Sequence, residues 1–249
     1  DMKNEQQSDA DAKKFQKRCE DVLKKDMGSR EFLSRYDEFM WYPAEVDVSI
    51  RRGWFYHRLQ YFTVKSIDKL MRIYYGAVGG NSLLLLNIPP DKRGLFAQKD
   101  VKRLEEIGDL IRKEEALEIP LVAAEYEGET KDGFSAENLL KDKTFSPKLV
   151  CSEYELRFGF GGRVVDRLLL REDTDFSQRV EKFEILTEKD KERVKLFDGT
   201  VIGFNKIAIF DKIYTDNVIL RITECRKEPY IKTVKVYEEG GYVPRVNRR

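Results

Sequence analysis

The run Ser82-Leu-Leu-Leu-Leu-Asn87 carries no charge, and Pro89-Pro90 closes it. A short apolar run that ends at prolines is typical of a strand buried on both faces, as parallel strands under helices are. This stretch therefore predicts that the surrounding part of the chain is built on a parallel sheet covered by helices.

Amphipathic segments lie on both sides of this run. From Thr63 to Val78 the apolar residues recur every three or four positions, Ser66 can cap the start, and Gly79-Gly80 ends the pattern. A second helical pattern runs from about Lys99 to Glu115. We expect a helix before the apolar strand and another after it.

A further strand is predicted upstream, where Ala44-Glu-Val-Asp-Val-Ser-Ile50 alternates and Arg52-Gly53 breaks the alternation. Strand, helix, buried strand, helix is the order of a parallel α/β architecture such as part of a (β/α) barrel. Two such units cannot close a barrel, which needs eight and typically about 250 residues. We therefore expect the last quarter or third of a barrel.

The pattern changes beyond Pro120, where β-rich segments alternate polar and apolar residues between Gly, Asp, Asn and Lys turns. This is typical of an antiparallel β-sandwich. The predicted fold class is α/β plus all-β: the last part of a (β/α)8-like (TIM-type) barrel in residues 1–118, then an antiparallel β-sandwich in residues 119–249. A charged segment from about Ala10 to Asp26 is predicted to form a mostly exposed helix.

Composition narrows the possible functions. The 249 residues carry 46 Lys and Arg against 45 Asp and Glu, and this balance argues against nucleic acid or an anionic membrane as a partner. Three scattered cysteines and one histidine suggest neither a disulfide framework nor a metal site, and no phosphate-binding glycine loop is present, so no cofactor is expected. No apolar run is long enough to span a bilayer, and residues 1–14 lack the core of a signal peptide. The chain is therefore cytoplasmic, or the protein begins upstream of it.

The candidate chemistry lies on the first strand. Side chains alternate along a strand, so Glu45, Asp47 and Ser49 share one face. If the intervening valines pack under the helices, the two carboxylates point into the barrel, where a carboxyl buried beside aromatic rings has a raised pKa and can donate a proton. The alternative is that Glu45 or Asp47 forms only an ion pair with Arg51 or Arg52.

Asn87 ends the second strand, where its amide would reach the top face of the barrel. An asparagine that merely caps the following turn is the alternative.

Three stretches closely resemble the α-L-fucosidases of glycoside hydrolase family 29. They are Trp41 to His57 (W-Y-P-A-E-V-D-V-S-I-R-R-G-W-F-Y-H), Thr63 to Leu70, and Tyr74 to Phe96. The resemblance is dense from about Ser34 to Arg112 and weaker in the β-rich half. It implies a retaining exo-glycosidase that removes terminal α-L-fucose from fucosylated glycans through a covalent fucosyl-enzyme, in a protein that is secreted or periplasmic.

The resemblance also implies roles for particular residues. Glu45 matches the acid/base glutamate of the P-A-E-x-D-x-S-I motif, with Asp47 as the second choice. Trp54 would cover the methyl group and apolar ring face of fucose, although packing against the barrel is its alternative role. The substrate-binding candidates are Trp54, Asp47, Arg51, His57 and Asn87, and for His57 a structural contact is the alternative.

The chain departs from the family upstream of Ser34, because it has neither the His-rich strand nor the W-x-D-G strand end that carries the nucleophile in relatives. We therefore do not expect this chain alone to turn over substrate. A non-catalytic carbohydrate-binding or scaffolding protein, in which the β-sandwich is the functional part, is the alternative function.

Overall fold

A computed structural model describes residues 34–38, 43–148 and 153–240. Of these, residues 43–148 and 153–240 belong to one compact unit, and residues 34–38 belong to a separate one. The helix predicted from Ala10 to Asp26 lies outside the described residues.

The first part of the compact unit is a two-stranded parallel sheet with two helices. In chain order its elements are β1 (Glu45–Ser49), α3 (Ile67–Ala77), β2 (Leu83–Asn87) and α4 (Gln98–Glu115). The two strands pair in parallel over their full length. The predicted order of strand, helix, strand and helix is confirmed, with each element within a few residues of its expected bounds.

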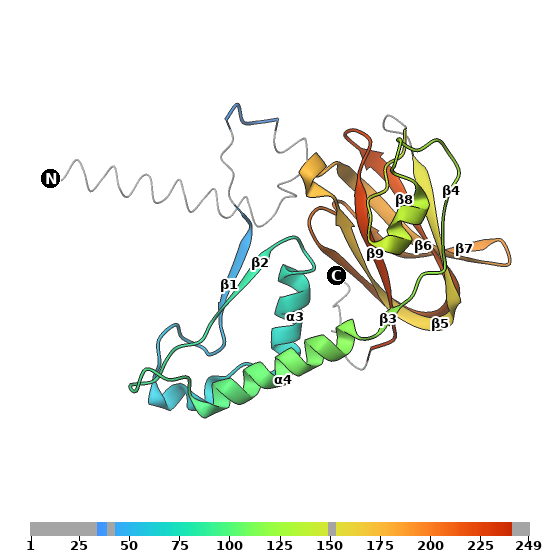
Figure 1. Ribbon diagram of the computed structural model, residues 1–249. Coiled ribbons are helices and arrows are strands. Elements are labelled where there is room, and N and C mark those ends of the chain that lie inside the picture. The colour runs from blue at the N-terminus through green and yellow to red at the C-terminus, as the bar shows by residue number, and fades with distance from the viewer. Residues whose placement is uncertain (1–33, 39–42, 149–152, 241–249) are drawn as a thin grey trace. The chain divides into compact units, whose positions relative to one another are not determined.

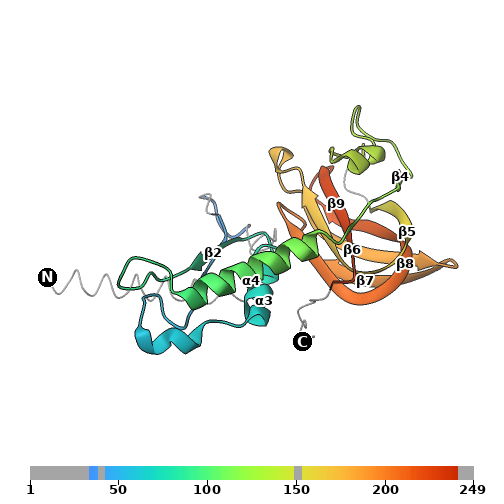
Figure 2. The ribbon, with the colours of Figure 1, turned by 60° about the horizontal axis from the view of Figure 1, so that its bottom comes forward.

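The start of α3 follows the predicted capping. The Ser66 hydroxyl accepts a hydrogen bond from the backbone N–H of Lys69 at 3.2 Å, which satisfies one of the free N–H groups of the first turn. A 3₁₀ helix, Arg58–Thr63, precedes this cap, so α3 begins later than the apolar pattern suggested. The two helices pack against each other in both views (Figures 1 and 2).

The apolar core of this part has a single side. Leu70 and Met71 of α3 and Ile107 of α4 are buried, and Leu86 of β2 packs against them. On the opposite face of β2, Leu83 is 60% exposed and Leu85 is 48% exposed. The prediction that β2 is buried on both faces is therefore wrong for the described structure, because no described segment covers that face.

The second part is a seven-stranded sheet of mixed strand lengths, and all of its pairings are antiparallel. Its strands run in the order β3-β9-β5-β8-β6-β7, with β4 paired to β5. Their bounds are β3 Glu118–Ile119, β4 Ala123–Tyr126, β5 Tyr154–Glu172, β6 Val180–Lys189, β7 Glu192–Gly199, β8 Lys206–Cys225 and β9 Ile231–Glu238.

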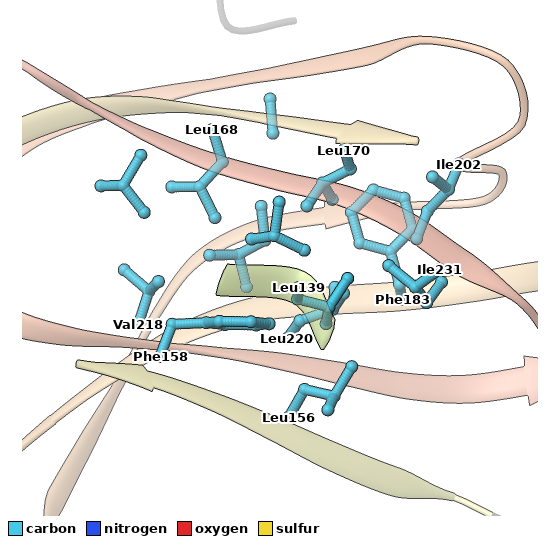
Figure 3. Packing of buried hydrophobic residues seen from close by; sticks show 14 of the residues in the cluster. Leu139, Leu156, Phe158, Leu168, Leu170, Phe183, Ile202, Val218, Leu220 and Ile231 are labelled. Carbon is cyan, nitrogen blue, oxygen red and sulfur yellow. The ribbon is translucent and has the colours of Figure 1, made fainter. Parts of the chain in front are cut away.

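Two long strands, β5 and β8, give this sheet two layers. In one layer, the first half of β5 pairs with β4 and with the second half of β8, and that half of β8 also pairs with β6. In the other layer, the second half of β5 pairs with the first half of β8 and with β9. Leu168 and Leu170 of one layer face Phe158 and Leu220 of the other in the core (Figure 3). These four side chains are 0% exposed, as expected for the interior of a β-sandwich.

Glycine turns were expected between the β-rich segments, but the glycines within β5 do not interrupt the strand. The β5–β8 register shifts between Gly159 and Arg163, and the strand bends there instead of ending. A Cβ at Gly162 would lie 2.4 Å from the Tyr214 hydroxyl oxygen, so the bend brings the backbone close to that ring. The glycines that seemed to mark a turn therefore mark a bulge.

The helices and the antiparallel sheet share contacts within the compact unit. Ile207 and Ile209 of β8 pack against the apolar cluster of α3 and α4. Asn205 donates from Nδ2 to the Val78 carbonyl at 2.7 Å, and Arg167 pairs with Glu114 of α4 at 2.8 Å. The connection between the two parts is also short, because α4 ends at Glu115 and β3 begins at Glu118.

Candidate functional site

The candidate site lies where β1 leaves the parallel sheet. Residues 50–57, which we call the exit loop, follow β1 directly. The backbone N–H of Ile50 donates to the Asn87 carbonyl at 2.9 Å, and the Ile50 carbonyl accepts from the N–H of Lys65 at 2.9 Å. The start of the loop is therefore held between β2 and the segment before α3.

Glu45 and Asp47 lie on the uncovered face of the parallel sheet. Parallel register places Glu45 beside Leu83 and Asp47 beside Leu85, so these four side chains share a face. Both carboxylates are exposed. The burial expected for Glu45 is therefore not present in the described residues, because the segments that would cover this face are not among them.

The alternative that Glu45 or Asp47 pairs with a neighbouring arginine is not what the described residues show. Arg51 turns away from β1 and pairs with Asp100 of α4, with Nε 2.9 Å from Oδ1 and Nη2 2.9 Å from Oδ2. Both side chains are 0% exposed. Asp100 lies in the first turn of α4, where the helix dipole also favours a negative charge.

This placement does not support the expectation that Arg51 binds substrate, which stays a prediction. A fully buried guanidinium that is committed to a buried carboxylate is not available to a ligand, and it ties the exit loop to α4 instead. The guanidinium lies 5.3 Å from the centre of the Tyr56 ring, which adds a cation–π contact.

Lys65 forms a second anchor for the loop. Its Nζ donates to the carbonyl of Ser49 and, at 2.9 Å, to the carbonyl of Arg51. Burial lowers the pKa of Lys65, and the nearby charge of Lys69 acts in the same direction. Two carbonyl acceptors at the end of β1 are thus satisfied by one ammonium group.

Trp54 is 50% exposed and Phe55 is 79% exposed. The backbone carbonyl of Trp54 accepts a hydrogen bond from Asn87 Nδ2 at 3.0 Å. Two exposed aromatic side chains on an anchored loop form an apolar surface of the kind that stacks on sugar rings.

The substrate-binding roles of Asn87 and His57 stay predictions, and the structure gives the surroundings of both residues. Asn87 is half-buried, and its Nδ2 also donates to the Ser49 hydroxyl at 3.2 Å, so one amide hydrogen is used at the end of β1 and the other in the exit loop. His57 is exposed and precedes the 3₁₀ helix, where its carbonyl accepts from the N–H of Gln60 at 2.9 Å.

Sequence reasoning missed three residues that build this site: Ser49, Lys65 and Asp100. The sequence did place Ser49 on the same strand face as Glu45, and this position could have indicated that Ser49 belongs to the site. Lys65 and Asp100 act through contacts distant in sequence and looked like ordinary charged residues near helix starts.

Within residues 34–38, 43–148 and 153–240, no cluster of three His, Cys, Asp or Glu side chains could hold a metal ion. None of the helices in the same ranges is long and apolar enough to cross a membrane.

The site geometry can be compared with known proteins. Residues 4–115 match the family described as Alpha-L-fucosidase. This match includes β1, the exit loop, β2 and both helices. The resemblance inferred from the motifs is thus confirmed.

Relatives extend the similarity into the antiparallel sheet. The chain is 31% identical over 208 residues to Alpha-L-fucosidase 1 of Arabidopsis thaliana, which covers 79% of the chain but 41% of that protein. The structure also resembles the crystal structure of a candidate α-L-fucosidase from Bacteroides ovatus, with a TM-score of 0.73 and 34% sequence identity. The matched region covers 90% of this chain and 35% of the Bacteroides ovatus chain. The crystal structure of a candidate α-L-fucosidase from Bacteroides thetaiotaomicron matches with a TM-score of 0.77 and 28% sequence identity. That match covers 89% of this chain and 50% of the other. The chain therefore spans less than half the length of the plant relative.

Proposed function

We propose that this chain supplies the acid/base carboxylate of a retaining, exo-acting α-L-fucosidase, and that Glu45 is that carboxylate. The observation that carries the proposal is the fucosidase-family match across β1, where the P-A-E-x-D-x-S-I motif puts Glu45 and Asp47 on the one uncovered face of the parallel sheet. A sheet face with two carboxylates and two exposed leucines suits the interior of a barrel whose other strands close over it.

In this mechanism Glu45 acts twice. It first protonates the glycosidic oxygen as a nucleophilic carboxylate attacks the anomeric carbon, which releases the glycan and forms a fucosyl-enzyme. It then removes a proton from the water that hydrolyses this intermediate. The nucleophile stands about 5 to 5.5 Å from the acid/base in retaining enzymes, and we place it in a segment outside these 249 residues.

The remaining residues of the site bind or shape the substrate pocket. Trp54 covers the methyl group and apolar face of fucose. Asp47 on β1 and His57 in the exit loop are also exposed, and we assign them to substrate binding. We assign residues 1–118 to the barrel and 119–249 to a β-sandwich that supports it. From the family resemblance alone, we infer that the enzyme is secreted or periplasmic.

Replacing Glu45 with Gln in the complete enzyme tests the role of this residue. Hydrolysis of natural fucosides, which need protonation of the leaving oxygen, should fall by about 10²- to 10⁴-fold. Aryl fucosides with good leaving groups should still form the fucosyl-enzyme rapidly, and azide should restore their turnover by replacing water as the nucleophile.

Asp47→Asn is the matched control, because Asp47 shares the strand, the face and the exposure of Glu45. The proposal predicts that this variant shows no azide rescue. Rescue in Asp47→Asn and not in Glu45→Gln would move the acid/base role to Asp47. Equal losses on both substrate types in Glu45→Gln would remove Glu45 from proton transfer.

A further inference from the structure

Ser49 and Asn87 form a hydrogen-bonded pair at the ends of the two parallel strands. They are direct partners in the β1–β2 register. The Asn87 Nδ2 donates to the Ser49 hydroxyl at 3.2 Å and to the Trp54 carbonyl at 3.0 Å, and the Ser49 hydroxyl donates to the Gly53 carbonyl at 2.7 Å. We call this pair the hydroxyl–amide clamp.

The clamp uses the whole donor capacity of both side chains. A primary amide has two N–H donors and a hydroxyl has one, and all three point at the exit loop or at each other. Ser49 is 6% exposed, so its hydrogen bonds are protected from competing water. Such groups are costly to leave unpaired, which makes the arrangement specific.

The two carbonyls that the clamp holds are consecutive along the chain. The Gly53 carbonyl belongs to the peptide plane before the Trp54 Cα, and the Trp54 carbonyl belongs to the plane after it. Because peptide planes are rigid, a hydrogen bond to each carbonyl restrains the rotation of its plane, and the two bonds together restrict the backbone dihedrals of Trp54. The direction in which the indole leaves the backbone follows from these dihedrals.

The rest of the loop is anchored independently of the clamp. Lys65 holds the carbonyls of Ser49 and Arg51, and the Arg51–Asp100 pair ties the loop to α4. Loss of the clamp should therefore loosen Trp54 without releasing the end of β1.

We propose that Ser49 and Asn87 are positioning residues that orient Trp54 for contact with the sugar. This inference rests on the proposed function, since it assumes that Trp54 covers fucose. It changes the role expected for Asn87, because the amide hydrogens that would reach a substrate are instead used to hold the loop.

The first test follows the motion of Trp54 in this chain. Trp41→Phe leaves Trp54 as the only tryptophan, because the sequence has two. In that background, time-resolved fluorescence anisotropy should show a larger amplitude of fast indole motion in Asn87→Leu and in Ser49→Val. Ser49→Thr, which has the shape of valine but keeps the hydroxyl, should retain the restricted motion.

Asn138→Leu is the matched control for Asn87→Leu. Asn138 Nδ2 also bridges two loop carbonyls, those of Gly133 at 2.7 Å and Thr144 at 2.9 Å, but in the antiparallel part of the chain. It should change stability without changing the motion of Trp54. Equal indole motion in Asn87→Leu and Asn138→Leu would overturn the proposal.

The second test measures kinetics in the complete enzyme. If Trp54 contacts the sugar equally in the ground state and the transition state, clamp variants should raise KM for fucosides about fivefold and leave kcat within about twofold. Ser49→Thr should restore KM relative to Ser49→Val. If Trp54 moves more freely in the clamp variants but KM is unchanged, the positioning role is overturned and the role of Glu45 is unaffected. If the unsubstituted enzyme does not hydrolyse fucosides, the proposed function itself is overturned.

Discussion

Glu172 shows how one buried residue can organise several loops. Its side chain is nearly inaccessible, and its carboxylate accepts from the backbone N–H groups of Arg179 at 2.7 Å, Val180 at 2.9 Å and Gly203 at 2.7 Å. Arg179 and Val180 lie at the start of β6, and Gly203 lies in the connection between β7 and β8. Burial raises the pKa of Glu172, and the three N–H groups oppose this effect only in part.

The raised pKa predicts a distinctive pH dependence. The native state binds the Glu172 proton more tightly than the unfolded state does, so the contribution of this group to the free energy of unfolding falls as pH rises from the ordinary value of 4.5 through the raised one. Glu172→Gln should remove this slope. Urea denaturation from about pH 4 to 8 should therefore show a less negative dependence on pH in the variant than in the parent.

Glu127→Gln provides the control, since Glu127 is exposed to solvent. Its slope should match that of the parent. At neutral pH, Glu172→Gln should cost about 1 to 3 kcal/mol, because an amide N–H₂ replaces one acceptor oxygen in front of a buried N–H. A slope in Glu172→Gln identical to the parent's would contradict the assignment.

At the scale of elements, the Arg51–Asp100 pair connects the end of β1 to the start of α4. Breaking such a buried pair leaves an uncompensated charge, so Asp100→Leu should destabilise the fold by about 3 to 5 kcal/mol. Adding Arg51→Met removes that charge, and the double variant should be more stable than Asp100→Leu alone. Urea denaturation of the parent, both single variants and the double variant gives the coupling energy.

The exposed pair Arg112–Asp109 gives the reference for this cycle. Its side chains are 69% and 63% exposed, so Asp109→Leu should change stability by less than about 1 kcal/mol. A double variant no more stable than Asp100→Leu would show that the cost arises from lost packing and not from the unpaired guanidinium.

Two glycines near the end of α3 should respond in opposite ways to alanine. Gly76 is helical and exposed, and a Cβ there would meet nothing within 4 Å, so Gly76→Ala should stabilise by about 0.5 to 1 kcal/mol. At Gly79 a Cβ would lie 2.4 Å from the Tyr75 carbonyl oxygen and 2.9 Å from the Ile207 Cβ. Gly79→Ala should therefore destabilise, and thermal unfolding of the two variants should shift in opposite directions.

The elements near the site could be predicted because local patterns determine them. The alternation from Ala44 to Ile50 and the helical spacing after Ser66 each reflect one-sided burial within a single element. The apolar run of β2 was misjudged because a run of leucines does not report what covers each face. Leu83 and Leu85 face no described segment, whereas Leu86 packs under the helices.

The contacts of the candidate site were less predictable. Arg51 finds Asp100 49 positions away, and Asn87 finds Trp54 33 positions away, so neither partner could be read from local spacing. Similarly, Gly162 at the bend of β5 looked like part of a turn because its close approach to Tyr214 depends on a residue 52 positions later. Long-range partners of polar side chains and bends within long strands need the tertiary structure.

At the scale of the whole molecule, the sequence suggested two folds joined end to end, but the structure shows shared packing. Ile207 joins the apolar cluster of the helices. Asn205, just before β8, donates from its side chain to the Val78 carbonyl and from its backbone N–H to Asn81 Oδ1 at 2.8 Å. Arg167 adds a buried pair with Glu114, with side chains 4% and 7% exposed. These contacts couple the stability of the helical part to that of the sheet.

We therefore expect the two parts to unfold together. With Trp41→Phe taken as the parent, the fluorescence of Trp54 reports on the first part of the compact unit, whereas far-UV circular dichroism near 215 nm is dominated by the strands of the second. Urea unfolding curves from the two probes should coincide in the parent. In Ile207→Asp, which places a charge in the shared cluster, the fluorescence midpoint should fall below the circular dichroism midpoint, because the helical part loses its packing while the interior of the sheet is kept. Noncoincident curves in the parent would mean that the sheet folds independently and that the shared contacts contribute little to its stability.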